Sequence, residues 1–152
     1  MSKANLRALI VGTSLLFATN AFAVDNAVSN DAPDLSSPRA KIKAKDYKAA
    51  INELTPMLAT QQHADIYNLL GFSLRKSGDM KQAATFYAKA LDFDSNHKGA
   101  LEYQGEMFVE LGQIEKAKVN LARLVTLCPQ GCEEQEDLAK AIAKASTSAM
   151  TN

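Results

Sequence analysis

From Ser37 onward, apolar residues recur at intervals of three and four, and no stretch alternates apolar and polar positions as a strand does. This spacing places the apolar side chains on one face of a helix. The region is also rich in Ala, Leu, Lys, Glu and Gln, which favour helices. Glycines stand between the periodic segments, at Gly78, Gly112 and Gly131. The pattern predicts an all-α chain whose helices of roughly a dozen residues are separated by glycine-containing turns.

One block of sequence recurs after 34 residues. Its glycines are Gly71 and Gly105, and Ala83 and Ala117 follow them at the same distance. The residues that open the first copy are Tyr67, Leu70, Gly71 and Leu74, and those that open the second are Leu101, Gln104, Gly105 and Phe108. Two copies in register indicate stacked, equivalent helical hairpins.

This spacing resembles the tetratricopeptide repeat (TPR): an aromatic residue, Leu-Gly, a second large residue, then Ala and Pro within about 34 residues. Residues 64–97 and 98–131 each carry the pattern, and Leu101, Gln104 and Ser95 depart from it. The resemblance implies an all-α helical-hairpin solenoid over residues 37–145. Its expected parts are a partial repeat (37–63), two repeats (64–97 and 98–131) and a C-terminal capping helix (132–145), with residues 146–152 frayed.

The partial repeat has its own signals. Ser37 as N-cap and Pro38 at the first helical position predict a short helix that runs to about Lys45. Pro56 is expected to kink or shorten the second helix of this repeat, because proline lacks the amide hydrogen that a helix interior needs.

The first 23 residues have the features of a signal peptide. Lys3 and Arg7 precede a short apolar run (8–18), and Ala21-Phe22-Ala23 forms a small-x-small cleavage site. The apolar run is shorter than the roughly 20 residues that span a bilayer, although an uncleaved anchor is the alternative. We therefore predict a signal peptide (1–23), a flexible leader (24–36), a periplasmic or secreted mature protein, and no membrane span after cleavage.

The charge balance bears on the class of partner. Seventeen basic and 17 acidic residues give a formal net charge of +0, which argues against nucleic acid. No nucleophile, phosphate-loop or metalloprotease motif is present. His63 and His97 occupy equivalent repeat positions, too far apart for one metal ion to bridge easily. The sequence predicts neither an enzyme nor a cofactor.

Cys128 and Cys132 are the only cysteines. Export would place them in an oxidising compartment, and the intervening Pro-Gln-Gly can form a tight turn. A structural disulfide that fixes the start of the last helix is the favoured interpretation. A reduced pair remains open, as does a metal- or redox-handling role for the two thiols.

The TPR resemblance also implies a concave groove, lined by the first helix of each repeat, that commonly binds peptides or helices. Alignment places these residues in the groove: Asn68, Phe72, Arg75, Lys76, Glu102, Glu106 and Glu110. The three glutamates form an acidic stripe on one helix face. The stripe either binds a partner or is a solvated face, neutralised by Arg75 and Lys76. The acidic residues after Cys132 are explained by the helix dipole.

These observations predict a periplasmic interaction module that binds a protein or peptide segment in its groove, in a scaffold or assembly role. The alternative is a metal- or redox-handling protein that uses Cys128 and Cys132. A homo-oligomeric assembly element is a third reading.

Overall fold

The computed structural model describes residues 32–150, with side chains to residue 147, so the predicted signal peptide and residues 24–31 of the leader lie outside the described residues. Every regular element in this range is a helix, in the order α1 (Ser36–Lys43), α2 (Tyr47–Met57), α3 (Ala64–Lys76), α4 (Met80–Phe93), α5 (Lys98–Glu110), α6 (Ile114–Leu127) and α7 (Glu133–Met150). The all-α prediction is confirmed.

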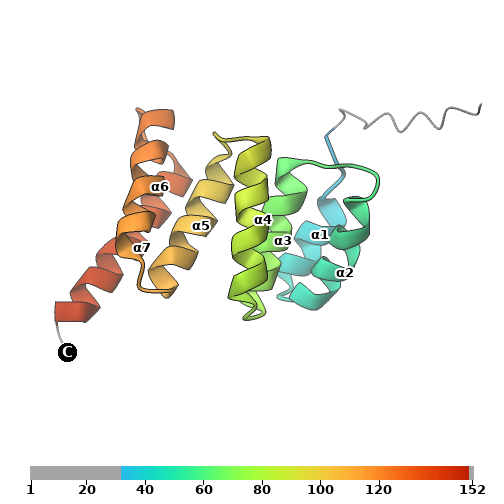
Figure 1. Cartoon of the computed structure of the whole chain (residues 1–152), viewed down its shortest axis with the longest axis horizontal. Coiled ribbons are helices and arrows are strands. Elements are labelled where there is room, and N and C mark those ends of the chain that lie inside the picture. Colours follow the sequence, from blue (N-terminus) through green and yellow to red (C-terminus); the bar gives the residue numbers. More distant parts are fainter. Residues whose placement is uncertain (1–31, 151–152) are drawn as a thin grey trace, which may run out of the picture.

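The helices pair as hairpins, α1 with α2, α3 with α4 and α5 with α6, and the hairpins follow one another along the long axis of the molecule (Figure 1). The first helices touch in succession, α1 with α3, α3 with α5 and α5 with α7. Among the described elements, the second helices α2, α4 and α6 make no such contacts with one another. The second helices therefore splay on the outer side, and the first helices line an inner, concave side. This arrangement confirms the helical solenoid.

Two glycines allow the closest helix contacts. A Cβ atom on Gly71 would lie 2.7 Å from Cδ1 of Tyr87, and one on Gly105 would lie 2.5 Å from Cδ2 of Leu138. Both distances are far below a normal carbon–carbon contact. Gly71 therefore seats α4 against α3 within one hairpin, whereas Gly105 seats α7 against α5.

The last helix is part of the hydrophobic core. Leu138 and Ile142 of α7 are buried with Leu101 of α5 and Leu124 of α6. Burying a leucine side chain contributes about 1.5–3 kcal/mol, so these contacts bind α7 firmly to the last hairpin.

The turns between paired helices share one backbone feature. Gly78 and Gly112 have φ of 90° and 70° and follow the ends of α3 and α5. The corresponding turn after α1 has Lys45 at φ 61°. Glycine adopts this conformation without a steric penalty, whereas lysine does not. The turn of the partial repeat is therefore more strained than the turns of the two full repeats.

Three local predictions can be compared with the structure. Pro56 lies in the last turn of α2, which has 11 residues where α4 and α6 have 14, so the predicted shortening is confirmed. Helix α1 begins at Ser36 after an N-cap at Leu35, so the prediction of Ser37 as N-cap is wrong. Asp34 accepts the Ser36 amide hydrogen instead, and the Ser37 hydroxyl donates to Glu53.

Helix α7 continues five residues beyond Ala145, so the prediction of a frayed tail is wrong for residues 146–150. No glycine or proline stops the helix there. The hydroxyls of Ser146 and Thr147 donate to the carbonyls of Ile142 and Lys144. Across residues 32–150, no helix combines the length and apolar character needed to cross a bilayer.

Candidate functional site

A concave pocket of about 340 Å³ lies on the inner side of the stack, near the N-terminal ends of α3, α5 and α7. Every first helix contributes to its lining: Arg39 from α1, Asp65, Asn68 and Leu69 from α3, His97, Gly99, Glu102 and Tyr103 from α5 and its N-cap, and Glu133, Glu134 and Asp137 from α7. We call this space the polar pocket. It depends on four helices that are far apart in sequence.

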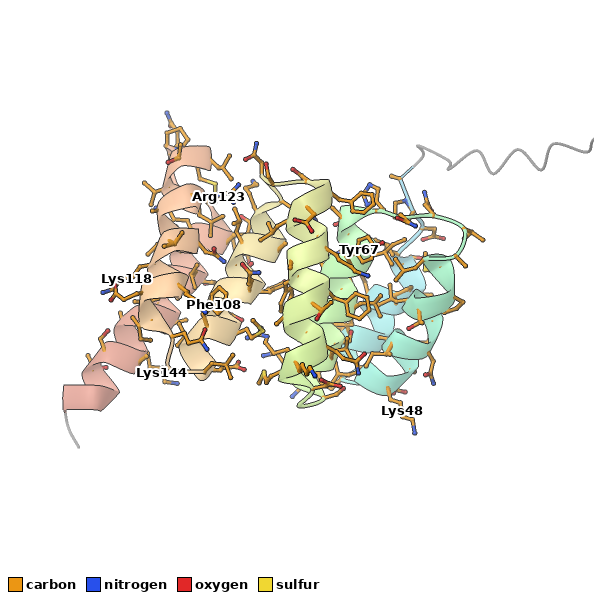
Figure 2. All side chains as sticks on the ribbon, viewed as in Figure 1. Lys48, Tyr67, Phe108, Lys118, Arg123 and Lys144 are labelled. Atoms are coloured by element: carbon orange, nitrogen blue, oxygen red, sulfur yellow. A yellow bond between two sulfur atoms is a disulfide. The ribbon has the colours of Figure 1, made fainter. Side chains whose placement is uncertain are left out.

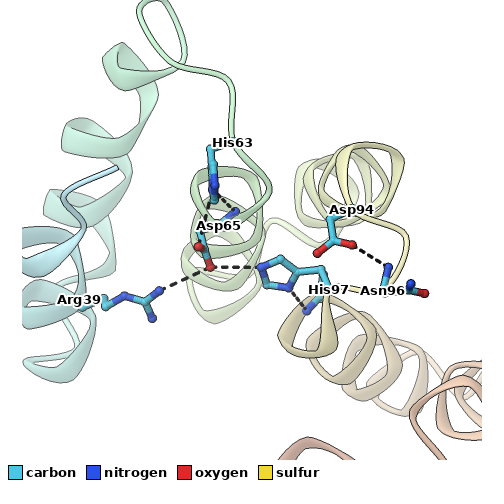
Figure 3. A network of polar contacts seen from close by, with 7 residues as sticks. Arg39, His63, Asp65, Asp94, Asn96 and His97 are labelled. Carbon is cyan, nitrogen blue, oxygen red and sulfur yellow. Dashed lines mark hydrogen bonds and ion pairs between the residues drawn. The ribbon is translucent and has the colours of Figure 1, made fainter. Parts of the chain in front are cut away.

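Asp65, which lines the pocket, is the centre of a polar network (Figure 3). Its Oδ1 lies 3.5 Å from Nη2 of Arg39 and 3.1 Å from Nε2 of His97. The Ala100 amide donates to Nδ1 of His97 at 3.0 Å, so the ring proton lies on Nε2 and is donated to Asp65. This arrangement fixes the His97 ring as the N-cap of α5. Arg39 and the His97 ring N–H together stabilise the carboxylate of Asp65.

His63 has the equivalent role one repeat earlier. Its Nδ1 accepts the amide hydrogen of Asp65 at 3.2 Å and caps α3. The two histidines therefore serve as helix caps at equivalent positions. No group of three histidine, cysteine, aspartate or glutamate side chains within residues 32–147 is arranged to hold a metal ion.

Glu102 also lines the polar pocket and is only 8% exposed. No ion pair among the described residues includes its carboxyl group. Burial is the main cause that raises the pKa of Glu102 to about 8, and the charges of Glu106, Asp137, Glu134 and Glu133 raise it further. Burial and the neighbouring acids thus favour the protonated form of this carboxyl group.

Asn68 stands one repeat length before Glu102 and lines the same pocket. Its side chain is 4% exposed, and its Oδ1 has no hydrogen-bond partner. Most buried polar atoms in proteins are hydrogen-bonded, and each exception needs a reason. Gly99 faces this amide, because a Cβ atom there would lie 3.1 Å from Nδ2 of Asn68. The amide nitrogen of Asn68, and not its sealed oxygen, therefore lies toward Gly99 and the pocket.

The acidic stripe does not act as one surface. The side chain of Arg75 is 1% exposed, and it donates to Glu106 Oε2 at 2.6 Å and to Glu110 Oε1 at 2.8 Å. This pairing supports the reading of internal neutralisation for Glu106 and Glu110, but not for Glu102. Lys76 does not pair with the stripe as that reading expected; its Nζ lies 5.4 Å from the ring centroid of Phe72.

An apolar pocket of about 230 Å³ adjoins the polar pocket. Its lining is Arg39, Ile42, Lys43, Leu69, Phe72 and Tyr103, and the polar pocket shares Arg39, Leu69 and Tyr103. The rings of Phe72 and Tyr103 are 4.8 Å apart, and Tyr47 packs edge-on against Phe72 at 6.3 Å. The rings of Phe72 and Tyr103 thus lie side by side in the lining of the apolar pocket.

The seven predicted groove residues therefore divide among several places. Asn68 and Glu102 line the polar pocket, and Phe72 lines the apolar pocket. Lys76, Glu106 and Glu110 line a third, shallower hollow beside the C-terminal half of α7. Arg75 lies beneath the surface. The seven residues share the inner side of the stack without forming a single site.

Sequence reasoning missed the other lining residues of the polar pocket: Arg39, Asp65, Leu69, His97, Gly99, Tyr103, Glu133, Glu134 and Asp137. One signal could have found the three on α7. Leu138 stands one repeat length after Gln104 and two after Leu70. Helix α7 is thus in register with the first helix of a further repeat, and its N-terminal acidic residues belong on the groove.

Cys128 and Cys132 lie at disulfide distance, with Sγ atoms 2.22 Å apart and Cα atoms 5.8 Å apart. The bond joins the end of α6 to the residue before α7, next to Glu133 and Glu134 of the polar pocket. Because each sulfur is engaged by the other, a metal- or redox-handling role for the pair is not favoured.

The sequence model of one family, described as tetratricopeptide repeat, matches residues 64–97. No curated protein matches the chain. The matched segment spans α3 and α4 and supports membership in this family. Proteins with such repeats are typically not enzymes, and the repeats generally mediate protein–protein interaction.

Proposed function

From the tetratricopeptide repeat at residues 64–97, we propose that this chain is an interaction module that holds a segment of a protein partner in its concave groove. One observation carries the proposal: a polar and an apolar pocket adjoin on the inner side, and their lining comes from four successive first helices. Ligand sites commonly combine apolar walls with a few placed polar groups.

A polypeptide segment fits this surface better than a compact small molecule. The two pockets share Arg39, Leu69 and Tyr103 as a common wall, so neighbouring side chains of one segment reach both.

The outer helices expose charged side chains to solvent. Lys48 on α2 and Lys118 on α6 project into solvent (Figure 2), and Lys118 pairs with Glu115 of its own helix.

The test is a peptide-display selection against the protein, followed by affinity measurement on the selected peptides. Phe72→Ala removes a ring from the groove wall, and Val119→Ala removes a smaller apolar group from the outer face of α6, where Val119 is 62% exposed. Phe72→Ala is expected to weaken binding about tenfold or more, with Val119→Ala unchanged. Equal effects of the two substitutions, or no selected peptide at all, would refute groove binding.

We also propose that the protein acts outside the cytoplasm, in the periplasm or as a secreted protein. The tripartite N-terminal segment supports this, as does the pairing of Cys128 with Cys132, since disulfides persist in oxidising compartments. Intact-mass measurement on protein from a periplasmic fraction is expected to show a chain that begins at Val24. A membrane-bound form that retains Met1 would contradict export.

A further inference from the structure

We propose that the apolar pocket binds an aromatic or large aliphatic side chain of a partner segment that carries an acidic residue one or two positions away. This inference rests on the proposed function and names the chemistry of the segment that the groove selects. Three features support it: the size of the apolar pocket, the basic side chains around it, and the separation of these bases from the acidic residues of the groove.

The apolar pocket has room for one side chain. Its volume is about 230 Å³, whereas pockets that hold a whole drug-sized ligand usually measure about 300–1,000 Å³. Its apolar lining comes from Ile42, Leu69, Phe72 and Tyr103. Leu69 is buried, and the other three are partly buried and remain accessible from solvent. An apolar side chain that enters would be removed from water by aliphatic and aromatic groups.

Basic side chains surround this apolar lining. Arg39 and Lys43 line the pocket, and Nζ of Lys76 lies 5.4 Å from the ring centroid of Phe72. Arg39 lies 3.5 Å from Asp65, but its side chain is 57% exposed, so this pairing is weak. Lys43 and Lys76 are exposed, and no ion pair within residues 32–147 includes either of them. The two lysines are therefore available to a carboxylate of a partner.

The acidic residues of the groove lie elsewhere. The residues that line the apolar pocket include no acid, and Glu102 and the three acids of α7 line the polar pocket instead. Glu106 and Glu110 share the third hollow with Lys76, but both accept hydrogen bonds from the buried Arg75. The charges around the apolar pocket are therefore positive, which attracts an acidic residue of the partner and disfavours a basic one.

The spacing of side chains in an extended segment fits this arrangement. Alternate residues of such a segment lie on one face, roughly 6–7 Å apart. When one side chain enters the apolar pocket, an acidic residue one or two positions away lies near its rim. A lysine ammonium group on its flexible four-carbon stem can then reach the carboxylate. Because Lys43 lines the apolar pocket and not the polar one, the acidic residue should lie on the Lys43 side.

The experiment uses acetylated and amidated peptides, so that terminal charges do not contribute. Starting from a peptide obtained by display, the apolar residue is replaced by Ser, and the acidic residue by its amide and by Lys. A further peptide keeps a free C-terminal carboxylate. Affinity is measured by fluorescence anisotropy at low and at high salt.

Two protein variants change the rim of the pocket. Lys43→Gln with Lys76→Gln neutralises it, and Lys43→Glu with Lys76→Glu reverses its charge. The matched controls make the same changes at Lys48 and Lys89, which lie on second helices and line neither pocket. Lys89 matches Lys76 closely, because its Nζ lies 5.7 Å from the ring centroid of Tyr67. Melting curves establish that each variant is folded, and the neutral pair decides the outcome where the reversed pair does not fold.

We expect the change to Ser at the apolar residue to weaken binding about tenfold or more. The change from acid to amide should weaken it about three- to tenfold, the change to Lys should weaken it further, and both effects should shrink at high salt. The preference for the acidic residue should disappear in the neutral rim variant and persist in the controls.

Peptides that bind in the groove with no preference for an acidic residue would overturn this inference and leave the proposed function intact. Binding that requires the free C-terminal carboxylate would overturn it in the same way. If no peptide of any composition binds, the proposed function fails and the inference fails with it.

Discussion

The repeats at 64–97 and 98–131 have the same helical framework but present different side chains to the groove. Their first helices, α3 and α5, have 13 residues each and are both capped by a histidine, and their second helices have 14 residues each. At three equivalent positions on the inner side, the first repeat has Asn68, Phe72 and Lys76, and the second has Glu102, Glu106 and Glu110. The repeat motif thus specifies the scaffold, and the residues between motif positions determine the surface chemistry.

The same contrast exists inside the stack. Leu70 and Phe86 of the first repeat belong to one apolar cluster. Their equivalents in the second repeat are Gln104 and Asn120, and Asn120 Nδ2 donates to Gln104 Oε1 at 3.0 Å. The departure of Gln104 from the motif is therefore matched by a second departure that satisfies its hydrogen bond. An apolar pair has been replaced by a polar pair at one position of the fold.

The largest loss of stability is expected around Arg75, a residue of the first repeat that pairs with two glutamates of the second. Glu106→Gln combined with Glu110→Gln leaves the buried guanidinium without an anionic partner, which typically costs about 3 kcal/mol or more. Urea denaturation measures the loss. The control, Glu115→Gln with Glu136→Gln, changes two exposed glutamates. An unchanged urea midpoint in the variant with Glu106→Gln and Glu110→Gln would show that the ion pairs of Arg75 do not stabilise the fold.

Replacing Glu102, Glu106 and Glu110 by Lys would test the acidic stripe as a binding surface only if the protein stayed folded. The structure predicts that this triple variant is strongly destabilised, because two new lysines would face Arg75. Circular dichroism through a thermal ramp distinguishes these outcomes.

The two close-contact glycines differ in the helix that each one seats. Gly71→Ala places a methyl group against the fully buried ring of Tyr87. Gly105→Ala places one against Leu138, which is also fully buried, at a shorter distance. The gain in helix propensity of about 1 kcal/mol offsets part of the cost at both positions. We expect a loss of stability of about 2 kcal/mol for each substitution, measured by urea denaturation. No loss at one of the positions would show that the helix seated there can shift without cost.

Removal of the disulfide should have a smaller and local effect. Replacing Cys128 and Cys132 by Ser frees a short loop, which the loop-entropy relation values at about 2 kcal/mol at most. Helix α7 stays attached through Leu138 and Ile142, so faster hydrogen exchange should be confined to residues near 128–137. Exchange that accelerates throughout α5 and α6 as well would show that the bond supports the whole hairpin.

The smallest effect concerns the pH dependence due to Glu102. Its pKa in the folded protein, about 8, lies above its unfolded value, so the folded state binds more protons between about pH 4.5 and 8. This contribution is fully present below that range and is lost as pH rises through it. Glu102→Gln should therefore stabilise the protein by about 1 kcal/mol at pH 8.5, with a smaller change at pH 5. Identical pH profiles of the two proteins would contradict the raised pKa.

Much of the scaffold could be predicted from the sequence because the repeat fixes both helix spacing and close contacts. The positions of Gly71 and Gly105, the turns at Gly78 and Gly112, and the shortening of α2 by Pro56 all follow from local rules. The start of α1 did not, because Asp34 supplies the cap from outside the expected helix.

The candidate site was less predictable because it is assembled across repeats. Glu102 could be placed on the inner face from sequence, but nothing local distinguished it from Glu106 and Glu110. The distinction arises because Arg75 reaches two glutamates and not the third. The contribution of Glu133 and Glu134 depended on recognising α7 as a further first helix in register with the repeats.

If partners bind between the first helices, amide groups on those helices should change their chemical shifts when a peptide binds. NMR chemical-shift mapping, with a display-selected peptide titrated into the protein, measures this. We expect the shifts to concentrate on α1, α3, the N-terminal half of α5 and the start of α7, with the exposed faces of α2, α4 and α6 unchanged. Shifts centred on those outer faces would refute binding in the groove.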